Sequence, residues 1–286
     1  MDWNAHKTTW PMAEHSRFVL SRPHKWHVQQ AGSGPLVLLI HGAGGATQSW
    51  RHLFPLLIPH FTVVAFDLPG QGFTRLGAPD RCGLDPMTLD IHALCRQEGW
   101  RPHALIGHSA GGAIALRLAE LMARHPPAVV GINAALDTFK GLAGVLFPAM
   151  AKTLAMMPMV ADLFTASTAR RGSVERLIAG TGSHLPREDL DWYRALVSDR
   201  AHVNATLQMM AQWNLSPLIG RLREHPSRAL LLAGDNDRAV PPGVSFRAAA
   251  AIPHARAARL QNLGHLAHEE DAAGVRDAML PFLQGK

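Results

Sequence analysis

Residues 105–112 read Leu-Ile-Gly-His-Ser-Ala-Gly-Gly, so Ser109 lies two residues after Gly107 and two residues before Gly111. Glycines at these positions allow a tight turn after an apolar run, and such a turn exposes the serine hydroxyl at the end of a strand. A hydroxyl held there could attack a carbonyl carbon if a histidine accepted its proton. Ser109 could instead be an ordinary helix N-cap. The rest of the chain therefore has to supply a base, an acid and an anion site.

The base has to be chosen by position, because the chain holds 17 histidines. His265 follows a predicted last strand at residues 257–260, in a loop that can reach back toward Ser109. His268 falls at the start of the next predicted helix and is the second candidate. His108 adjoins Ser109, but neighbouring side chains at a strand–helix turn point apart, so we expect His108 in the wall of the substrate pocket.

The histidine base needs a carboxylate that fixes its tautomer and stabilises its charged form. The stretch Gly234-Asp-Asn-Asp-Arg follows another predicted strand and offers two carboxylates. Asp237 lies farther beyond the strand end and is the predicted acid, whereas Asp235 is expected to form the turn. The chain order Ser109, Asp237, His265 matches that of one large group of serine hydrolases.

A negative charge that develops on a substrate oxygen needs backbone N–H donors aimed at it. The glycine-rich stretch His41-Gly-Ala-Gly-Gly follows a predicted strand, so its backbone can approach a substrate closely. We assign the two donors to the backbone N–H groups of Ala43 and Ala110. A phosphate-binding loop is disfavoured because no lysine follows these glycines. The stretch Asp67-Leu-Pro-Gly-Gln-Gly, after the next strand, is expected to be a structural turn.

Short apolar runs alternate with helix-like segments over most of the chain, which is typical of a doubly wound, mostly parallel α/β sheet with buried strands. The expected strands lie at residues 36–40, 62–66, 103–106, 128–132 and 228–232. A helix is expected at residues 109–124. Residues 18–21 and 26–29 precede the first parallel strand and are expected to form an antiparallel edge.

The alternation stops between about residues 136 and 217, where prolines interrupt long helix-like stretches rich in methionine. We predict that residues 136–217 form a helical cap, inserted between the core segments 1–135 and 218–286. It would lie over the carboxyl ends of the strands, where open α/β sheets bind ligands. The predicted pocket residues are His108, Met157, Met210 and Trp213. Methionine suits irregular apolar ligands, but a methionine stripe is more often plain core.

Composition argues against several other classes of protein. Lys and Arg outnumber Asp and Glu by 28 to 22, but they are scattered and no nucleic-acid motif accompanies them, so we expect no nucleic-acid partner. Two cysteines without metal-like spacing predict neither a disulfide framework nor a metal site, and no cofactor is expected. The sequence shows no signal peptide and no apolar run of about 18 residues, which predicts a cytoplasmic protein with at most peripheral membrane contact.

Together these motifs resemble the α/β-hydrolase superfamily, and the resemblance covers nearly the whole chain. They are the stretches that begin His41-Gly-Ala, Asp67-Leu-Pro, Gly107-His-Ser, Gly234-Asp-Asn and Gly264-His. The resemblance implies an α/β-hydrolase fold with Ser109, Asp237 and His265 as its catalytic triad. It implies little about the substrate, because this fold hosts many chemistries.

A narrower resemblance, which includes the predicted cap, is to the magnesium-chelatase accessory proteins of bacteriochlorophyll biosynthesis in photosynthetic bacteria. It rests on residues 67–74, 107–112, 146–148, 181–183, 209–213 and 264–270. This resemblance implies action near the insertion of magnesium into protoporphyrin. The implied substrate is a tetrapyrrole or another small apolar molecule, and the implied partners are magnesium-chelatase subunits.

Three functional interpretations stay open at this point. The first is a serine hydrolase that cleaves an ester or related carbonyl bond. The second is a non-catalytic tetrapyrrole carrier or chelatase-assembly factor on a hydrolase scaffold, although a carrier has no need of an intact triad. The third is a general carboxylesterase or a C–C bond hydrolase, which would use the same residues. An aspartate-nucleophile dehalogenase or epoxide hydrolase is disfavoured because residue 109 is serine.

Overall fold

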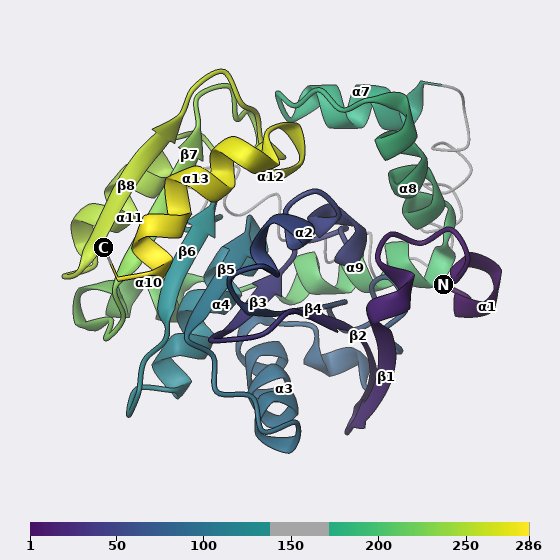
Figure 1. Cartoon of the computed structure of the whole chain (residues 1–286), viewed down its shortest axis with the longest axis horizontal. Coiled ribbons are helices and arrows are strands. Elements are labelled where there is room, and N and C mark those ends of the chain that lie inside the picture. Colours follow the sequence, from purple (N-terminus) through teal and green to yellow (C-terminus); the bar gives the residue numbers. More distant parts are fainter. Residues whose placement is uncertain (138–171, 286) are drawn as a thin grey trace.

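The computed structural model describes residues 1–137 and 172–285. At its centre lies an eight-stranded sheet in the order β1-β2-β4-β3-β5-β6-β7-β8 (Figure 1). The strands are β1 Ser16–Ser21, β2 His24–Ala31, β3 Leu36–Ile40, β4 Thr62–Phe66, β5 Ala104–His108, β6 Ala128–Ile132, β7 Ala229–Gly234 and β8 Ala255–Leu260.

The sheet is parallel from β4 to β8, and β1 and β2 form an antiparallel edge. Strand β3 lies at the centre, where Leu39 pairs with Ala65 of β4 and Ile106 of β5. The predicted α/β class with a mostly parallel sheet is confirmed. Each expected strand is present within a few residues of its predicted bounds, because a continuous apolar run is a local signal for a strand covered on both faces.

Helices cover both faces of the sheet. The helices packed on it are η2 Thr47–Trp50, α2 Phe54–Leu57, α3 Leu84–Gln97, α4 Ala110–Leu121, α11 Gly243–Ala251 and α13 Ala272–Leu283. Alternate residues of a strand point to opposite faces. Leu38 and Ile40 of β3 therefore join a core with α3, α4 and α11, whereas Val37 and Leu39 join a second core with η2, α2 and α13.

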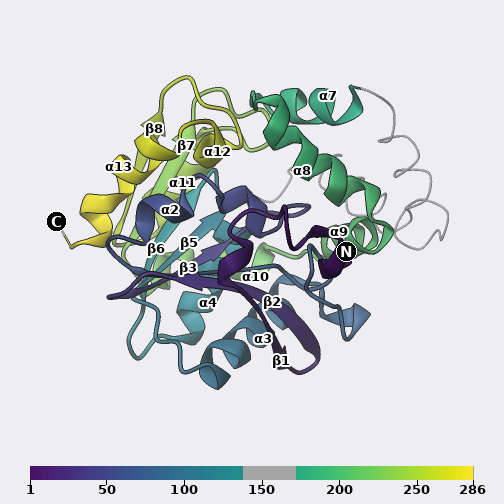
Figure 2. The same cartoon turned by 45° about the vertical axis from the view of Figure 1, so that its right-hand side comes forward.

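The described part of the predicted insertion is helical. Its helices are α7 Ser173–Gly180, α8 Arg187–Ser198, α9 Arg200–Gln212 and α10 Ser216–Arg221. Helices α7 and α8 stand apart from the sheet in both views (Figures 1 and 2), and they share a third apolar cluster with Trp10 of the N-terminal segment. Helix α10 straddles the predicted boundary at residue 217 and packs on the core through Leu218. Met157 lies outside the described residues.

The remaining elements are short. They are α1 Trp3–His6, η1 Ala13–His15, η3 Pro79–Arg81, η4 Leu222–Glu224 and α12 Ala267–Glu270. Within residues 1–137 and 172–285, no helix combines the length and the apolar character that crossing a membrane requires.

The turn between β5 and α4 holds Ser109 in an unusual backbone conformation, with φ 53° and ψ −118°. Such a conformation costs about 1–3 kcal/mol and persists only where the surrounding structure maintains it. A Cβ on Gly107 would come closer than 3.0 Å to the backbone of Gly111, and one on Gly111 would come closer than 3.0 Å to the Ile40 carbonyl oxygen. Glycine at both positions is therefore what lets the strand, the turn and the helix pack this closely.

We expect Gly111→Ala to lower the free energy of unfolding by about 1–3 kcal/mol or more, because the added methyl group meets backbone atoms of β3 that cannot rotate away. Gly180→Ala in α7 is the matched control, since an added Cβ there meets no atom within 4 Å. Alanine should stabilise that helix by about 0.5–1 kcal/mol. Urea denaturation of both variants measures the difference, and equal stabilities would contradict this account of the turn.

Candidate active site

Ser109 lies where the sequence predicted, between β5 and α4, and it lines a cavity. Its backbone is held by neighbouring segments. The N–H group donates to the Ile132 carbonyl at 3.0 Å, and the carbonyl accepts from the N–H groups of Gly112 and Ala135. The side chain makes no capping hydrogen bond to α4. The alternative role of Ser109 as a side-chain N-cap is therefore not seen, and its hydroxyl remains available to a ligand in the cavity.

His265 and Asp237 form a hydrogen-bonded pair, with 2.8 Å between Nδ1 and Oδ2. The other carboxylate oxygen accepts from the backbone N–H groups of Ala239 and Val240, each at 2.8 Å, which fixes the carboxylate in place. When Nδ1–H donates to Asp237, Nε2 of neutral His265 carries no proton and can accept one. His265 lines the same cavity as Ser109.

The second candidate base, His268, and the other carboxylate of the 234–238 stretch, Asp235, lie elsewhere. Asp235 pairs with Arg259 instead, with 2.7 Å between carboxylate and guanidinium atoms. His268 is fully buried and contacts the rings of Trp50 and His108, whose centroids are 4.6 and 4.5 Å away. Burial is the main reason that the pKa of His268 lies well below its usual value. Neither Asp235 nor His268 belongs to the described lining of the cavity.

The glycine-rich loop after β3, residues 42–45, forms the wall of the cavity next to Ser109. A Cβ on Gly42 would lie 3.0 Å from the Ser109 Cβ, so the loop backbone passes close to the serine. Buried His41 holds this loop. Its Nε2 accepts from the Leu68 N–H at 2.9 Å, which leaves the ring proton on Nδ1 to donate to the Gly42 carbonyl at 2.8 Å.

The two predicted oxyanion donors flank Ser109. Ala43 lies in the glycine-rich loop and lines the cavity. Ala110 is the first residue of α4, where backbone N–H groups have no partner within the helix. Neither N–H group donates to an acceptor in residues 1–137 or 172–285. Both groups are therefore free to bind a negatively charged oxygen, and their assignment as the oxyanion site stays a prediction.

The cavity has a volume of about 600 Å³ and lies between loops that follow the sheet strands and helices α7, α8 and α9. The loops contribute residues 42–45, Ser109 and His265, and the helices contribute apolar side chains such as Ile178 and Val203. The described lining includes no Lys, Arg, Asp or Glu. In the same part of the chain, no cluster of three or more His, Cys, Asp or Glu residues is arranged to hold a metal ion. These walls fit a neutral, mainly apolar ligand.

The four predicted pocket residues differ in where they lie. His108 and Met210 line the cavity, and 38% of Met210 is exposed. Trp213 is not in the described lining and packs against the larger apolar core instead. The reason is that α9 ends at Gln212 and Trp213 has an extended backbone, so it leaves the helical face that carries Met210. The placement of Met157 is not described.

Sequence analysis missed three polar residues at the site. Tyr193 of α8 and His202 of α9 line the cavity from the cap. Gln71, in a stretch expected to be only a structural turn, accepts the Gly44 N–H at 2.8 Å. The one available signal for His202 was a histidine in a helix-like stretch, which carries little weight among 17 histidines.

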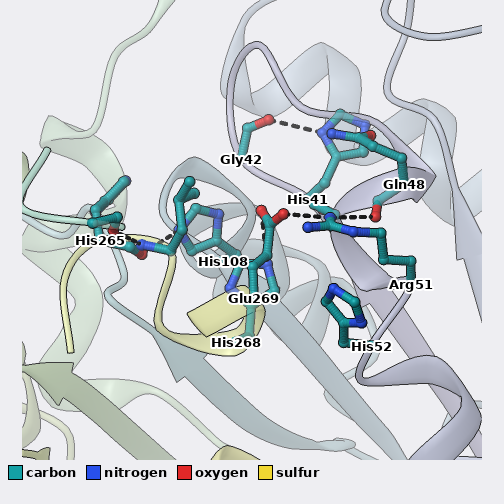
Figure 3. A network of polar contacts seen from close by, with 12 residues as sticks. His41, Gly42, Gln48, Arg51, His52, His108, His265, His268 and Glu269 are labelled. Atoms are coloured by element: carbon teal, nitrogen blue, oxygen red, sulfur yellow. Dashed lines mark hydrogen bonds and ion pairs between the residues drawn. The ribbon is translucent and has the colours of Figure 1, made fainter. Parts of the chain in front are cut away.

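Arg51 lies in a buried polar network, and Figure 3 shows its contacts with Glu269 and the Gln48 carbonyl. Its Nη1 lies 2.5 Å from Glu269 Oε2, and its Nε lies 2.7 Å from Asp189 Oδ1 on α8. The Tyr193 hydroxyl, also on α8, donates to Glu269. Burial raises the pKa of Glu269, although the charge of Arg51 opposes this shift. Two carboxylates thus share one buried guanidinium, which holds α8 against the segment that follows His265.

A family model described as the alpha/beta hydrolase fold matches residues 35–272. The chain belongs to the α/β-hydrolase family. This α/β hydrolase is 43% identical over 287 residues to the magnesium-chelatase 30 kDa subunit of Rhodobacter capsulatus, and the match covers 100% of both chains. It is 28% identical to the pimeloyl-[acyl-carrier protein] methyl ester esterase of Xanthomonas axonopodis pv. citri (strain 306), over 90% of this chain and 98% of that one.

Solved structures show the same fold. A thermophilic esterase from Thermogutta terrifontis matches with a TM-score of 0.72 at 20% sequence identity, over 94% of this chain and 98% of that one. The α/β-hydrolase resemblance expected from the motifs is therefore confirmed, and the resemblance to magnesium-chelatase proteins is supported by a relative matched along its full length.

In this α/β hydrolase, we expect Arg51→Met to lower the free energy of unfolding by about 3–5 kcal/mol, because it leaves two buried carboxylates without their cation. Arg247→Met is the matched control. Arg247 pairs with Asp137 at the surface, with 63% of its side chain exposed, and such pairs contribute at most about 1 kcal/mol. Urea denaturation compares the two variants, and similar losses in both would show that Arg51 does not hold the cap.

Proposed function

We propose that the protein is a serine hydrolase that cleaves an ester or related carbonyl bond, with Ser109 as nucleophile, His265 as base and Asp237 as acid. The observation that carries this proposal is the 2.8 Å hydrogen bond between His265 and Asp237, beside a cavity that Ser109 and His265 both line. This bond orients the imidazole and leaves Nε2 as its basic atom. Membership of the α/β-hydrolase family supports the proposal.

The reaction follows from these positions. Ser109 Oγ forms a bond to the carbonyl carbon, and its proton passes to His265 Nε2. The carbonyl electrons move onto the oxygen, whose negative charge is bound by the N–H groups of Ala43 and Ala110. When the intermediate collapses, the bond to the leaving alkoxide breaks and His265 returns the proton to it. Water then attacks the acyl-enzyme by the same route and releases the acid.

The described walls of the cavity favour a neutral apolar substrate, because a charged group placed against them would lose its hydration without gaining a partner. We propose that residues 136–217 act as the cap over this substrate. Relatives named as esterases support an ester as the scissile group. A general carboxylesterase and a C–C bond hydrolase are the alternatives that use the same residues.

We expect Ser109→Ala and His265→Ala each to lower kcat for a short ester by at least about 10³-fold without unfolding the protein, because each removes a group that acts on the reacting atoms. Asp237→Asn should cost about 10³–10⁴-fold, since the amide favours the wrong imidazole tautomer. Asp235→Asn is its matched control on the same turn, where Asp235 pairs with Arg259, and it should keep nearly full activity. Initial rates with p-nitrophenyl esters measure these effects.

Labelling with a fluorophosphonate gives a second readout of the nucleophile. The wild-type protein should react and Ser109→Ala should not. Wild-type-like turnover by either Ser109→Ala or His265→Ala would show that the triad is assigned wrongly. A larger loss in His268→Ala than in His265→Ala would move the base to His268.

A second proposal concerns the substrate, which we infer to be a tetrapyrrole or an ester of one, used in the cytoplasm near the magnesium-chelatase step of bacteriochlorophyll biosynthesis. It is supported by 43% identity along the whole chain to a protein named as a magnesium-chelatase subunit. A tetrapyrrole is a broad apolar plane edged by carboxylates or their esters, so burial of the plane would supply most of the affinity while any charged edge stays in water at the mouth of the cavity. Chelatase subunits would then be partners, and a non-catalytic carrier on the same scaffold is the alternative.

We expect the Ser109→Ala protein to bind magnesium protoporphyrin saturably, because this change leaves the apolar walls of the cavity intact. Soret absorbance or quenching of the seven tryptophans measures binding. A covalent serine inhibitor on the wild-type protein should compete with the ligand. No saturable binding up to the solubility limit, together with ready hydrolysis of simple fatty esters, would favour a general esterase. Stimulation of chelatase by a variant without a working triad would favour the carrier.

A further inference from the structure

The glycine-rich loop is held by side chains that come from elsewhere in the chain. The Gly44 N–H donates to Gln71 Oε1 at 2.8 Å, and the Gly44 carbonyl oxygen lies 3.2 Å from His202 Nε2. Gly44 has a φ of 78° and no side chain of its own to restrict it. Gln71 therefore restrains the peptide group before Gly44, and His202 restrains the one after it together with the Gly45 N–H, which donates to the Gly42 carbonyl at 3.1 Å.

His202 can make its hydrogen bonds in only one neutral form. Nδ1 accepts from the Gly72 N–H at 3.0 Å, so the ring proton lies on Nε2, which donates to the Gly44 carbonyl. Burial lowers the pKa of His202 to about 4, although the charges of Asp199 and Asp67 oppose the shift. The ring is therefore neutral near pH 7 and keeps both hydrogen bonds.

Both side chains that bind Gly44 are connected to helix α9: His202 belongs to this helix, and Gln71 contacts it. His202 lies in the first turn of α9, where Asp199 caps the helix by accepting the His202 N–H at 2.8 Å. Gln71 donates its side-chain N–H to the Met209 sulfur, farther along the same helix, at 3.2 Å. Helix α9 is thus connected at two places to the residues that hold the loop.

We infer that His202 is a positioning residue for the oxyanion site: it holds the loop of residues 42–45 in the orientation that aims the Ala43 N–H at the developing negative charge. This inference rests on the proposed serine-hydrolase function. His202 touches no reacting atom. It acts through the Gly44–Gly45 peptide group, whose N–H donates at 3.1 Å to the Gly42 carbonyl, and that carbonyl belongs to the peptide group that carries the Ala43 N–H. Donors that are already oriented need no rearrangement during the reaction, and a displacement of about 1 Å can cost about 10²-fold in rate.

Two substitutions separate the two hydrogen bonds of His202. In His202→Gln, the side-chain amide reaches the position of Nε2 and can donate to the Gly44 carbonyl. In His202→Asn, the shorter amide reaches only the position of Nδ1 and can serve Gly72 alone. We expect His202→Asn to lower kcat for a short ester by about 10- to 100-fold with little change in KM, and His202→Gln to retain most of the wild-type kcat.

A transition-state analogue separates positioning from a merely structural role. A trifluoromethyl ketone forms an oxyanion when Ser109 adds to it, so its affinity should fall in His202→Asn in step with kcat/KM. The affinity for an uncharged amide analogue of the ester should not change. Gln212→Leu is the matched control, because it removes a different bond between α9 and the core, from Gln212 to the Pro79 carbonyl at 2.7 Å, and it should leave kcat unchanged.

A wild-type-like kcat in folded His202→Asn would overturn the inference and leave the proposed function intact. An equal loss of kcat in His202→Gln or in Gln212→Leu would overturn it as well. If His202→Asn does not fold, His202→Ala takes its place, because it also removes the donor to the Gly44 carbonyl, and an unchanged kcat would again be decisive against the inference. A wild-type protein that neither hydrolyses esters nor reacts with a fluorophosphonate would overturn the proposed function and this inference together.

Discussion

The close packing of backbone at the Ser109 turn is the constraint on which the candidate site depends. Gly107 approaches Gly111, and Gly111 approaches the carbonyl oxygen of Ile40, so that β5, α4 and β3 meet at one point. The strained conformation of Ser109 is maintained by this contact. Because the same contact places the start of α4 beside the end of β3, the serine, the Ala110 N–H and the glycine-rich loop keep one relative geometry.

Two of the polar connections between the core and helices α8 and α9 differ in kind. Arg51 binds Asp189 of α8 and Glu269, which follows His265 closely in the chain, and this connection is charged and buried. His202 of α9 reaches Gly44 as a neutral ring. One connection lies near His265 and the other lies at the glycine-rich loop. The positions of helices α8 and α9 and the geometry of the candidate site are therefore parts of the same packed structure.

The core and the helices α7 to α9 contribute different kinds of residue to the cavity. The core supplies Ser109, His265 and the glycine-rich loop to the cavity, whereas the cap supplies mainly apolar side chains. One fold hosts many chemistries, so the substrate has to be argued from the residues that line the site and not from the fold. The 43% identity to the Rhodobacter capsulatus protein extends over the whole chain, residues 136–217 included, and is not confined to the α/β core.

The sequence by itself determined the strands, the α/β class and the positions proposed for nucleophile, base and acid, because apolar runs, glycine spacing and loops at strand ends are local signals. Only the tertiary structure decided which residues meet. It pairs His265 with Asp237, packs the partly buried Trp213 against the core because α9 ends before it, and brings His202 to Gly44. His202 and Gly44 are 158 positions apart in the chain, and a contact of that kind leaves no local pattern because it exists only once the cap has packed over the sheet.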